Sequence, residues 1–298
     1  MNRKADMRSV IITADDFGLS EAINEAVERA HRDGILTSAS LMVGAPAADD
    51  AIARARRMPD LKVGLHVVLV QGEPVLPPSE VPALLGRDGR FPDNLARAGL
   101  KWFFSPAARR QLRREVAAQF AAFRETGLAL DHVNAHNHMH LHPTVLSAIL
   151  AELNPAGLNA SHPAAVRLPR EPWSASLRGV SSVRIRAVLE RGVMAPWLKV
   201  MEHRLKRRGI PHNQWLFGLT ETGRMNEATL LQVIDTLPEG VVEIYCHPAT
   251  RRPGAITNSM SGYDNEGEFH ALVSGRVRTR LVERKLRVGG FADICKPA

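Results

Sequence analysis

The chain has 298 residues, of which 45% are hydrophobic and 23% charged, an ordinary globular composition with enough chain to bury a large core. Its two cysteines, Cys246 and Cys295, are too few for a secreted scaffold held by disulfides, and no stretch approaches the roughly 18 apolar residues of a membrane-spanning helix. The first residues show no signal peptide, so we expect a protein of the reducing cytoplasm.

The net charge of +8 is concentrated in two basic clusters. Such clusters attract nucleic acid or anionic membranes, although a solvated helix face explains them equally well. The sequence shows no zinc-finger spacing, RNA-binding aromatic motif or heptad array, so we expect no nucleic-acid partner. The clusters consist of Arg109, Arg110, Arg113 and Arg114, and of Lys199, Arg204, Lys206, Arg207 and Arg208.

The predicted elements alternate between strand and helix along the chain. The β-branched run Ser9–Thr13 predicts a buried strand, and Ser20 can cap a helix that runs to about Asp33 and stops at Gly34. The later elements are strand 38–43, helix 47–58, strand 63–70, helix 107–126, strand 130–135, a helix opened by Pro143, helix 227–237, strand 241–246 and a helical tail over 267–286.

This alternation predicts one α/β domain over residues 1–298, built as a parallel barrel like the TIM barrel. About seven strand–helix units over this length favour a closed or partly closed barrel over an open sheet. Long loops are expected at about 71–105 and 157–215, because 71–94 and 167–172 are rich in Pro and Gly or Arg. Such loops often lie over the carboxyl ends of the strands, where barrel enzymes hold their active sites.

Two adjacent carboxylates, Asp15 and Asp16, follow the first strand, and His66 lies inside an apolar strand. A carboxylate pair at a strand end is costly unless it binds a cation or is well hydrogen-bonded, although a helix cap beside a solvated acid is common. A lone buried histidine is more often simply hydrogen-bonded than a metal ligand. Each signal is weak alone, so its weight depends on the residues at the other strand ends.

Five of the twelve histidines lie within residues 132–142, at the end of a predicted strand. Alternate side chains of an extended chain share a face, so His136 and His138 can point together toward the barrel mouth. Neutral imidazole is the commonest ligand of transition metals in proteins. Four histidines cannot all bind one ion, and His140 and His142 are better suited to orient ligands or to begin the next helix.

His247 follows the strand 241–246 and would face the same rim, unless it only hydrogen-bonds a loop. One ion held by a carboxylate and two histidines, with open positions for water and substrate, is a hydrolytic arrangement. A second carboxylate can take the proton of the attacking water, and a histidine opposite can protonate a leaving nitrogen. The sequence therefore indicates a hydrolase with one divalent ion, for which we expect zinc, with manganese, cobalt, nickel or magnesium as alternatives.

Two other classes of protein stay open at this point. A two-metal phosphodiesterase would need more clustered carboxylates than Asp15 and Asp16 supply. A lipid-binding or sugar-lipid-binding protein without catalytic activity could retain the same scaffold, although it would not need the full set of strand-end acids and histidines.

As a set, these motifs resemble the YdjC-like family of carbohydrate deacetylases over about residues 8–275. The likeness rests on Thr13–Ser20 (TADDFGLS), on Gly64–His66 (GLH), on the histidine cluster and on Cys246–Pro248 (CHP). It implies a deformed (β/α) barrel and an enzyme that removes N-acetyl groups from amino sugars. It also implies residue roles: Asp16, His66 and His136 as metal ligands, Asp15 as general base, His247 as general acid, and His138 as an alternative for ligation or substrate contact.

A finer resemblance is to the branch of the family associated with hopanoid biosynthesis. It rests on residues 69–78 (LVQGEPVLPP), 131–136 (DHVNAH) and 166–172 (VRLPREP). It implies N-acetylglucosaminyl hopanoid as substrate, a sugar on a polycyclic lipid, with Arg167 as a substrate contact; soluble chitooligosaccharides are the alternative. One departure is Asn134, which stands where the wider family has an acid that could support a ligand histidine.

Aromatic side chains stand beside basic ones at 100–104 (LKWFF) and 194–199 (MAPWLK). This combination suits the interface of an anionic membrane, and it also suits ordinary packing under a loop. On the first reading we expect Trp102 and Phe103 to line an apolar entrance for the lipid body of the substrate. The protein would then contact the inner face of the cytoplasmic membrane peripherally.

Overall fold

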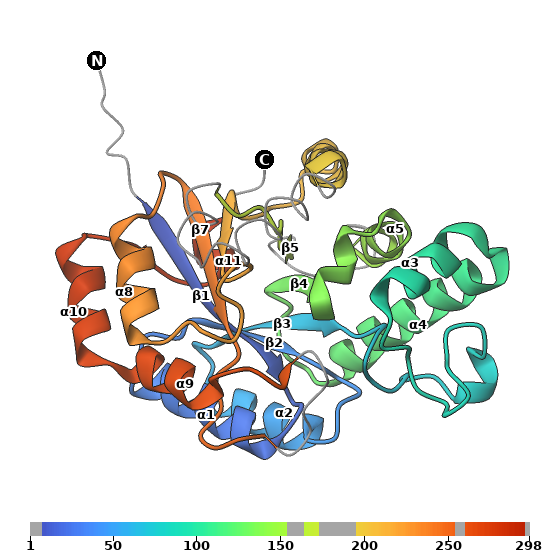
Figure 1. Cartoon of the computed structure of the whole chain (residues 1–298), viewed down its shortest axis with the longest axis horizontal. Helices are drawn as coiled ribbons and strands as arrows, with labels where there is room; N and C mark the ends of the chain where they lie inside the picture. Colours follow the sequence, from blue (N-terminus) through green and yellow to red (C-terminus); the bar gives the residue numbers. More distant parts are fainter. Residues whose placement is uncertain (1–7, 154–163, 173–194, 254–259, 296–298) are drawn as a thin grey trace.

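The computed structural model describes residues 8–153, 164–172, 195–253 and 260–295, and its centre is one parallel sheet (Figure 1). Seven strands follow each other in the order β5-β4-β3-β2-β1-β7-β6, and β8 pairs with the beginning of β1. The strands are β1 (Ser9–Phe17), β2 (Ser38–Leu41), β3 (Lys62–Val67), β4 (His132–Ala135), β5 (Ala165–Val166), β6 (Trp215–Phe217), β7 (Val241–Cys246) and β8 (Arg287–Val288).

Helices cover the outside of this sheet, with α1 and α2 below it, α8 to α10 on the left and α3 to α5 on the right of Figure 1. They are α1 (Glu21–Arg32), α2 (Ala48–Arg56), α3 (Leu95–Phe104), α4 (Pro106–Glu125), α5 (Pro143–Glu152), α8 (Glu227–Asp235), α9 (Asn265–Val273), α10 (Gly275–Glu283) and α11 (Phe291–Ile294). Residues 195–207 are also helical, and 3-10 turns lie at Pro78–Glu80 and His136–Leu141.

The sheet curls into a half-barrel whose edge strands, β5 and β6, are bridged at a few points. The Val166 N–H donates to the Pro211 carbonyl at 2.9 Å. The buried Asn213 side chain accepts from the Leu168 N–H at 2.7 Å and donates to the Leu168 carbonyl at 2.9 Å, so it substitutes for a strand partner. The deformed barrel of about seven parallel strands that the sequence predicted is confirmed.

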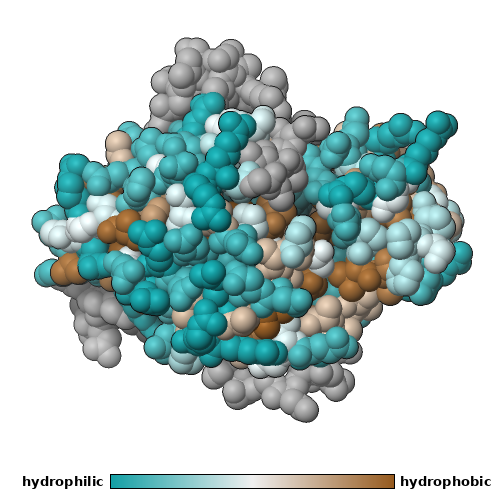
Figure 2. Space-filling view, turned by 90° about the horizontal axis from the view of Figure 1, so that it is seen from below, coloured by the Kyte–Doolittle hydropathy of each residue, from teal (hydrophilic) through white to brown (hydrophobic). Residues whose placement is uncertain are grey.

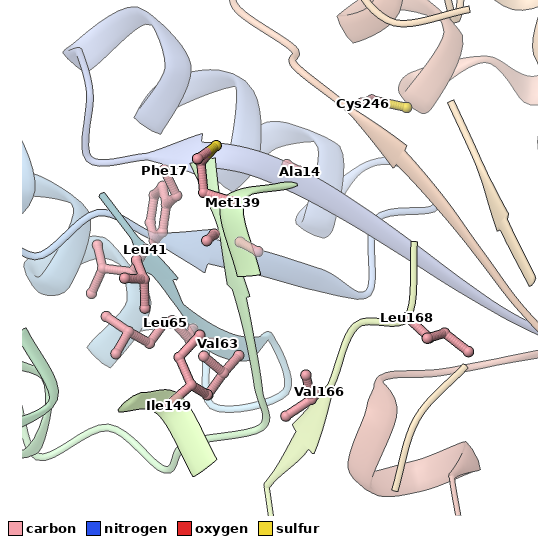
Figure 3. Close-up of a cluster of buried hydrophobic side chains, with 14 of the residues drawn as sticks. Ala14, Phe17, Leu41, Val63, Leu65, Met139, Ile149, Val166, Leu168 and Cys246 are labelled. Carbon is pink, nitrogen blue, oxygen red and sulfur yellow. The ribbon is translucent and has the colours of Figure 1, made fainter. Parts of the chain in front are cut away.

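Side chains alternate between the two faces of the strands, and the outward ones are apolar. Figure 3 shows Val63 and Leu65 of β3 near Ile149 of α5, all of them buried. Many inward residues of these strands, with Arg167 directly after β5, are polar and hydrogen-bond one another across the barrel, whereas the inward Ile11 packs with Phe291 and Ile294. The polar ones include Thr13, Asp15, Ser40, His66, His132, Asn134, Arg167 and Glu243.

Several element boundaries differ from the sequence prediction. The region 71–105, predicted to be a loop, contains α3, which begins where the Asn94 side chain accepts from the Arg97 N–H at 2.9 Å. The predicted loop 157–215 contains β5 and the helical residues 195–207, while 157–163 and 173–194 lie outside the described residues. The tail is two helices rather than one, because Ser274 ends α9 and caps α10.

The surface is mostly hydrophilic where Figure 2 shows it, with smaller brown apolar patches between the teal side chains. Within the described ranges, no helix combines the length and the apolarity that crossing a bilayer requires.

Candidate metal centre

Three side chains converge at the carboxyl ends of β1, β3 and β4. The ligand atoms that Asp16, His66 and His136 can offer all lie within 4.8 Å of one another, and all three side chains are buried. Parallel strands bring their carboxyl ends to one rim, so residues far apart in sequence meet there. In the part of the chain that the structure describes, this is the group of acids and histidines with the spacing of a metal site.

The distances within the cluster match those between ligands of one ion. Oδ1 of Asp16 lies 3.3 Å from Nε2 of His66 and 3.1 Å from Nδ1 of His136. Bonds of about 2.0–2.1 Å to a tetrahedral zinc ion place neighbouring ligand atoms roughly 3.3 Å apart. Oδ2 of Asp16 and Nε2 of His66 have no hydrogen-bond partner although they are buried. A divalent ion would satisfy polar atoms that are otherwise costly to bury.

The backbone at Asp16 explains how two consecutive carboxylates reach the interior. Neighbouring side chains in a regular strand point to opposite faces. Asp16 instead has φ +62°, in the left-handed region, and the register between β1 and β2 shifts between Ala14 and Phe17. This local irregularity turns Asp16 toward the same side as Asp15, and such strained residues cluster at functional sites.

Asn134 fixes the orientation of His66. Its Nδ2 donates to Oδ1 of Asp15 at 3.2 Å and to the Ser40 hydroxyl at 2.9 Å, so its Oδ1 faces the 2.6 Å contact with Nδ1 of His66. Since an amide oxygen only accepts, Nδ1 carries the imidazole proton and Nε2 keeps a lone pair for an ion. Asn134 therefore supports His66 as a neutral hydrogen-bond acceptor.

Asp15 is held by Arg167 from inside the barrel. The guanidinium contacts Oδ2 at 2.6 Å and Oδ1 at 3.0 Å. Burial alone would raise the pKa of Asp15, but the charge and hydrogen bonds of Arg167 lower it well below its usual range. Asp15 is thus ionised at any working pH, and it lies beside the metal cluster on the cavity wall.

The sequence predicted that Arg167 contacts the substrate, but the structure buries its side chain between two carboxylates. It has no exposed surface, because its guanidinium lies between Asp15 and Glu243, whose carboxylate accepts from Nε at 3.0 Å and from a terminal nitrogen at 2.6 Å. It also stacks over the Tyr245 ring, 4.9 Å from the ring centroid. Its geometry makes it the positioning partner of Asp15.

A cavity of ≈ 700 Å³ opens directly over the cluster. It is lined by the three candidate ligands and Asp15. Its lining also includes apolar side chains, among them Leu95, Leu198, Trp215, Leu219 and Met260, together with charged ones such as Arg170, Lys199 and Glu202. The polar lining can hold a sugar and its acetamido group, and the apolar lining can accept a less polar portion of the same molecule.

His138 and His247 line this cavity without belonging to the candidate ligand set. Nε2 of His138 lies 3.1 Å from the Tyr245 hydroxyl, and burial holds the pKa of this histidine well below its usual value, so the ring is neutral. Rings of Tyr245 and Tyr263 flank His247 at 5.4 and 4.9 Å. Nδ1 of each histidine is buried without a partner and is available to a bound substrate.

The two later histidines of the cluster have structural contacts. Nδ1 of His140 accepts from the Ala135 N–H at 3.1 Å, and Nε2 therefore donates to the Arg167 carbonyl at 3.0 Å. Burial lowers the pKa of His140 to about 3, which keeps the ring neutral. His142 caps α5, because its Nδ1 accepts from the Thr144 N–H at 3.2 Å.

The two aromatic residues expected at the entrance lie away from the cavity. Trp102 is 1% exposed and packs edge-on against His142, with ring centroids 5.8 Å apart, so it belongs to the core. Phe103 is half-exposed beside the same histidine and does not line the cavity. The sequence reasoning missed Glu243 and Tyr245, although alternation along β7 places both on the same face as His247.

The fold and the site define a class of protein: a parallel half-barrel with an acid–histidine cluster of metal-site geometry at the carboxyl ends of its strands. The chain belongs to the YdjC-like protein family, whose model matches residues 9–283. A carbohydrate deacetylase of Vibrio cholerae serotype O1 (strain M66-2) is 36% identical, with 96% of both chains covered. One of Brevibacillus brevis is 29% identical over 96% of this chain and 99% of its own.

Other relatives extend the comparison. A chitooligosaccharide deacetylase of Salmonella paratyphi B is 28% identical over 96% of this chain and 99% of its own. A crystal structure from Enterococcus faecalis V583, of a protein described as a candidate for cellobiose-phosphate cleavage, superposes with a TM-score of 0.72. It covers 96% of this chain and 98% of its own at 22% identity, and it supports the fold alone.

Proposed function

We propose that the protein is a metal-dependent hydrolase that removes the acetyl group from the amide nitrogen of an amino sugar. The observation that carries the proposal is the buried cluster of Asp16, His66 and His136, in which Oδ2 of Asp16 and Nε2 of His66 lack hydrogen-bond partners, beside the ionised Asp15. The printed names of the relatives, carbohydrate and chitooligosaccharide deacetylases, support the same reaction.

The donor set suits zinc, since two imidazoles and one carboxylate are typical of catalytic zinc sites with open positions. A bound divalent ion would supply Lewis acidity to the acetyl carbonyl. Asp15 accepts a proton from the attacking water, while Arg167 keeps the carboxylate in place. The oxygen of that water forms a bond to the acetyl carbon and the carbon–nitrogen bond breaks. His247 gives a proton to the departing nitrogen, leaving acetate and a free amine.

The substrate that we propose is N-acetylglucosaminyl hopanoid. The apolar residues of the cavity lining, among them Leu95, Leu198 and Trp215, support a substrate whose sugar is attached to a lipid. The sequence motifs at 69–78, 131–136 and 166–172 support the same branch. A short soluble chitooligosaccharide would leave much of this apolar lining without contact.

A deacetylation assay read by mass spectrometry tests both levels of the proposal. Purified protein receives N-acetylglucosaminyl hopanoid or diacetylchitobiose, each with zinc or with chelator, and Asp16→Asn is the matched variant. We expect zinc-dependent loss of one acetyl group from the hopanoid. Loss from diacetylchitobiose alone would retain the chemistry and reject the lipid substrate. No loss from either substrate with any divalent metal would overturn the proposed reaction.

A further inference from the structure

Large apolar side chains are exposed on two helices near the cavity. On α3, Leu100 is 62% exposed and Phe104 is 72% exposed. On the helix 195–207, Trp197 and Val200 are 39% and 44% exposed. Scattered single apolar residues on a surface need no explanation, but groups on adjacent helices mark interaction sites.

The helices that carry these groups, α3 and the yellow helix 195–207, lie on either side of α5 in Figure 1. The Thr144 hydroxyl lies 3.5 Å from the Trp102 carbonyl of α3. From the other side, Arg204 donates to the Pro143 carbonyl at 3.3 Å and to the Ser147 hydroxyl at 3.0 Å. The two helices that carry the exposed apolar residues therefore both contact the beginning of α5.

Both helices also reach the cavity. Leu95, at the beginning of α3, lines its wall, and so do Leu198 and Lys199 of the helix 195–207. The helices that carry the exposed apolar residues thus also form part of the cavity wall. A partner bound to this region would be adjacent to the active site.

The charges on α3 and on the first two turns of α4 are all basic, and helix 195–207 carries one acid, Glu202, which is paired with Arg170 and Lys206. Arg97, Lys101, Arg110 and Arg113 are exposed, and none forms an ion pair with a described acidic residue. A second copy of the chain would bring these cations against one another, which is unfavourable. An anionic lipid surface offers the complementary charge, and it also accepts apolar side chains below its headgroups.

We propose that this docking surface, formed by Leu100, Phe104, Trp197 and Val200 with the surrounding cations, binds an anionic lipid bilayer. The apolar side chains enter the interface while Arg and Lys pair with lipid phosphates or carboxylates. Binding holds the cavity mouth at the membrane, so a lipid-borne substrate can reach it without fully leaving the bilayer.

Co-sedimentation with vesicles tests this surface without any substrate. The full chain is mixed with phosphatidylcholine vesicles that contain or lack phosphatidylglycerol, at about 0.1 M and about 1 M salt, where the Debye length falls from about 10 to about 3 Å. We expect binding to the anionic vesicles at low salt and much weaker binding at high salt or to neutral vesicles. The double variant Leu100→Ser/Phe104→Ser should lower the partition coefficient about tenfold or more.

The matched control is Val282→Ser, since Val282 is 73% exposed on α10, away from this surface. Circular dichroism verifies that both variants fold, and size-exclusion chromatography reports their oligomeric state. The proposal is wrong if the wild type ignores anionic vesicles, or if the double variant binds them as well as Val282→Ser does. A wild-type dimer that the double variant dissociates would assign the surface to a second copy instead. None of these outcomes bears on deacetylation, which is measured separately on dissolved substrate.

Discussion

At the scale of single residues, Asp15 combines two properties that determine its chemistry. It lies on the cavity wall beside the metal cluster, and its carboxylate is fully ionised because Arg167 contacts both oxygens. A carboxylate of such low pKa is a weak base in water, so its usefulness depends on an acidified attacking water. The arrangement therefore makes the carboxylate and the ion interdependent: neither is an effective catalyst alone.

Asp15→Asn tests the assignment of the base. Asparagine cannot accept the proton, so we expect kcat to fall by about 10²–10⁴-fold while zinc content stays at the wild-type level. The matched control is Glu243→Gln, which also removes a carboxylate partner from Arg167 but does not line the cavity. It should lose stability with a much smaller effect on kcat. Wild-type turnover in Asp15→Asn would show that another group acts as the base.

The lowered pKa of His140 predicts how the free energy of unfolding depends on pH. Its pKa is about 3 in the folded protein, against an ordinary value of about 6.5, so between these values the unfolded chain binds a proton that the folded chain does not. The free energy of unfolding should therefore fall as pH decreases from about 6.5 toward 3, with a contribution of about 1.4 kcal/mol per pH unit from this group. Buried carboxylates such as Asp15, whose pKa is lowered, add to the loss only below about pH 4.

Urea denaturation of wild type and His140→Gln at pH 7, 6, 5 and 4 isolates this contribution. Glutamine can still donate to the Arg167 carbonyl and accept from the Ala135 N–H, but it cannot titrate. The variant should show a flatter pH dependence of the unfolding free energy. Equal slopes for the two proteins would mean that His140 is not held neutral by its surroundings.

At the scale of elements, the longer strands and their arrangement in a partly closed barrel were predictable from sequence, and the two short edge strands were not. The run at 241–246 and the proline at 143 predict β7 and the beginning of α5, because local pattern and capping determine them. β5 and β6 have two and three residues, too few for a period of two to be visible. α3 was taken for loop, since the Pro- and Gly-rich segment before it concealed its Asn94 cap.

In the candidate site, too, some residues were predictable from the sequence and others were not. Asp16, His66 and His136 are recognisable because each follows or ends a strand and belongs to a motif. The supporting contacts are not, because they join residues far apart in sequence. Asn134 contacts a residue 68 positions away, and the Arg167 contact to Asp15 spans 152 positions. Pairings of this kind depend on strand order, which the sequence of one chain does not specify.

Asn213→Ala tests the bridge between the sheet edges. The substitution leaves the buried Leu168 N–H without its acceptor, which should lower the free energy of unfolding by about 1–3 kcal/mol. Leu168 follows Arg167, so we also expect a moderate loss of kcat. The control is the neighbouring Gln214→Ala, whose bond to the Val241 N–H is solvent-exposed and should be worth about 0.5 kcal/mol or less. Similar stability losses in the two variants would contradict the special role of the bridge.

At the scale of the whole molecule, the proposed metal site would link folding to metal binding. The candidate ligands come from three strands that meet only in the folded barrel, so an ion would bind the folded state and raise the free energy of unfolding by RT ln(1 + [ion]/Kd). At an ion concentration about 1,000 times the Kd, the gain is about 4 kcal/mol. We expect zinc to raise the melting temperature of the wild type by several degrees and a chelator to reverse this.

Asp16→Asn is the sharpest variant for this linkage, because asparagine tolerates the left-handed backbone at φ +62° while it lacks the charge that an ion requires. The zinc-dependent shift should disappear in Asp16→Asn and remain complete in His270→Gln, which removes an exposed histidine far from the cluster in sequence. A residual shift in Asp16→Asn equal to that of the wild type would place the bound ion elsewhere. Because the measurement needs no substrate, it separates the existence of the metal site from every statement about the reaction.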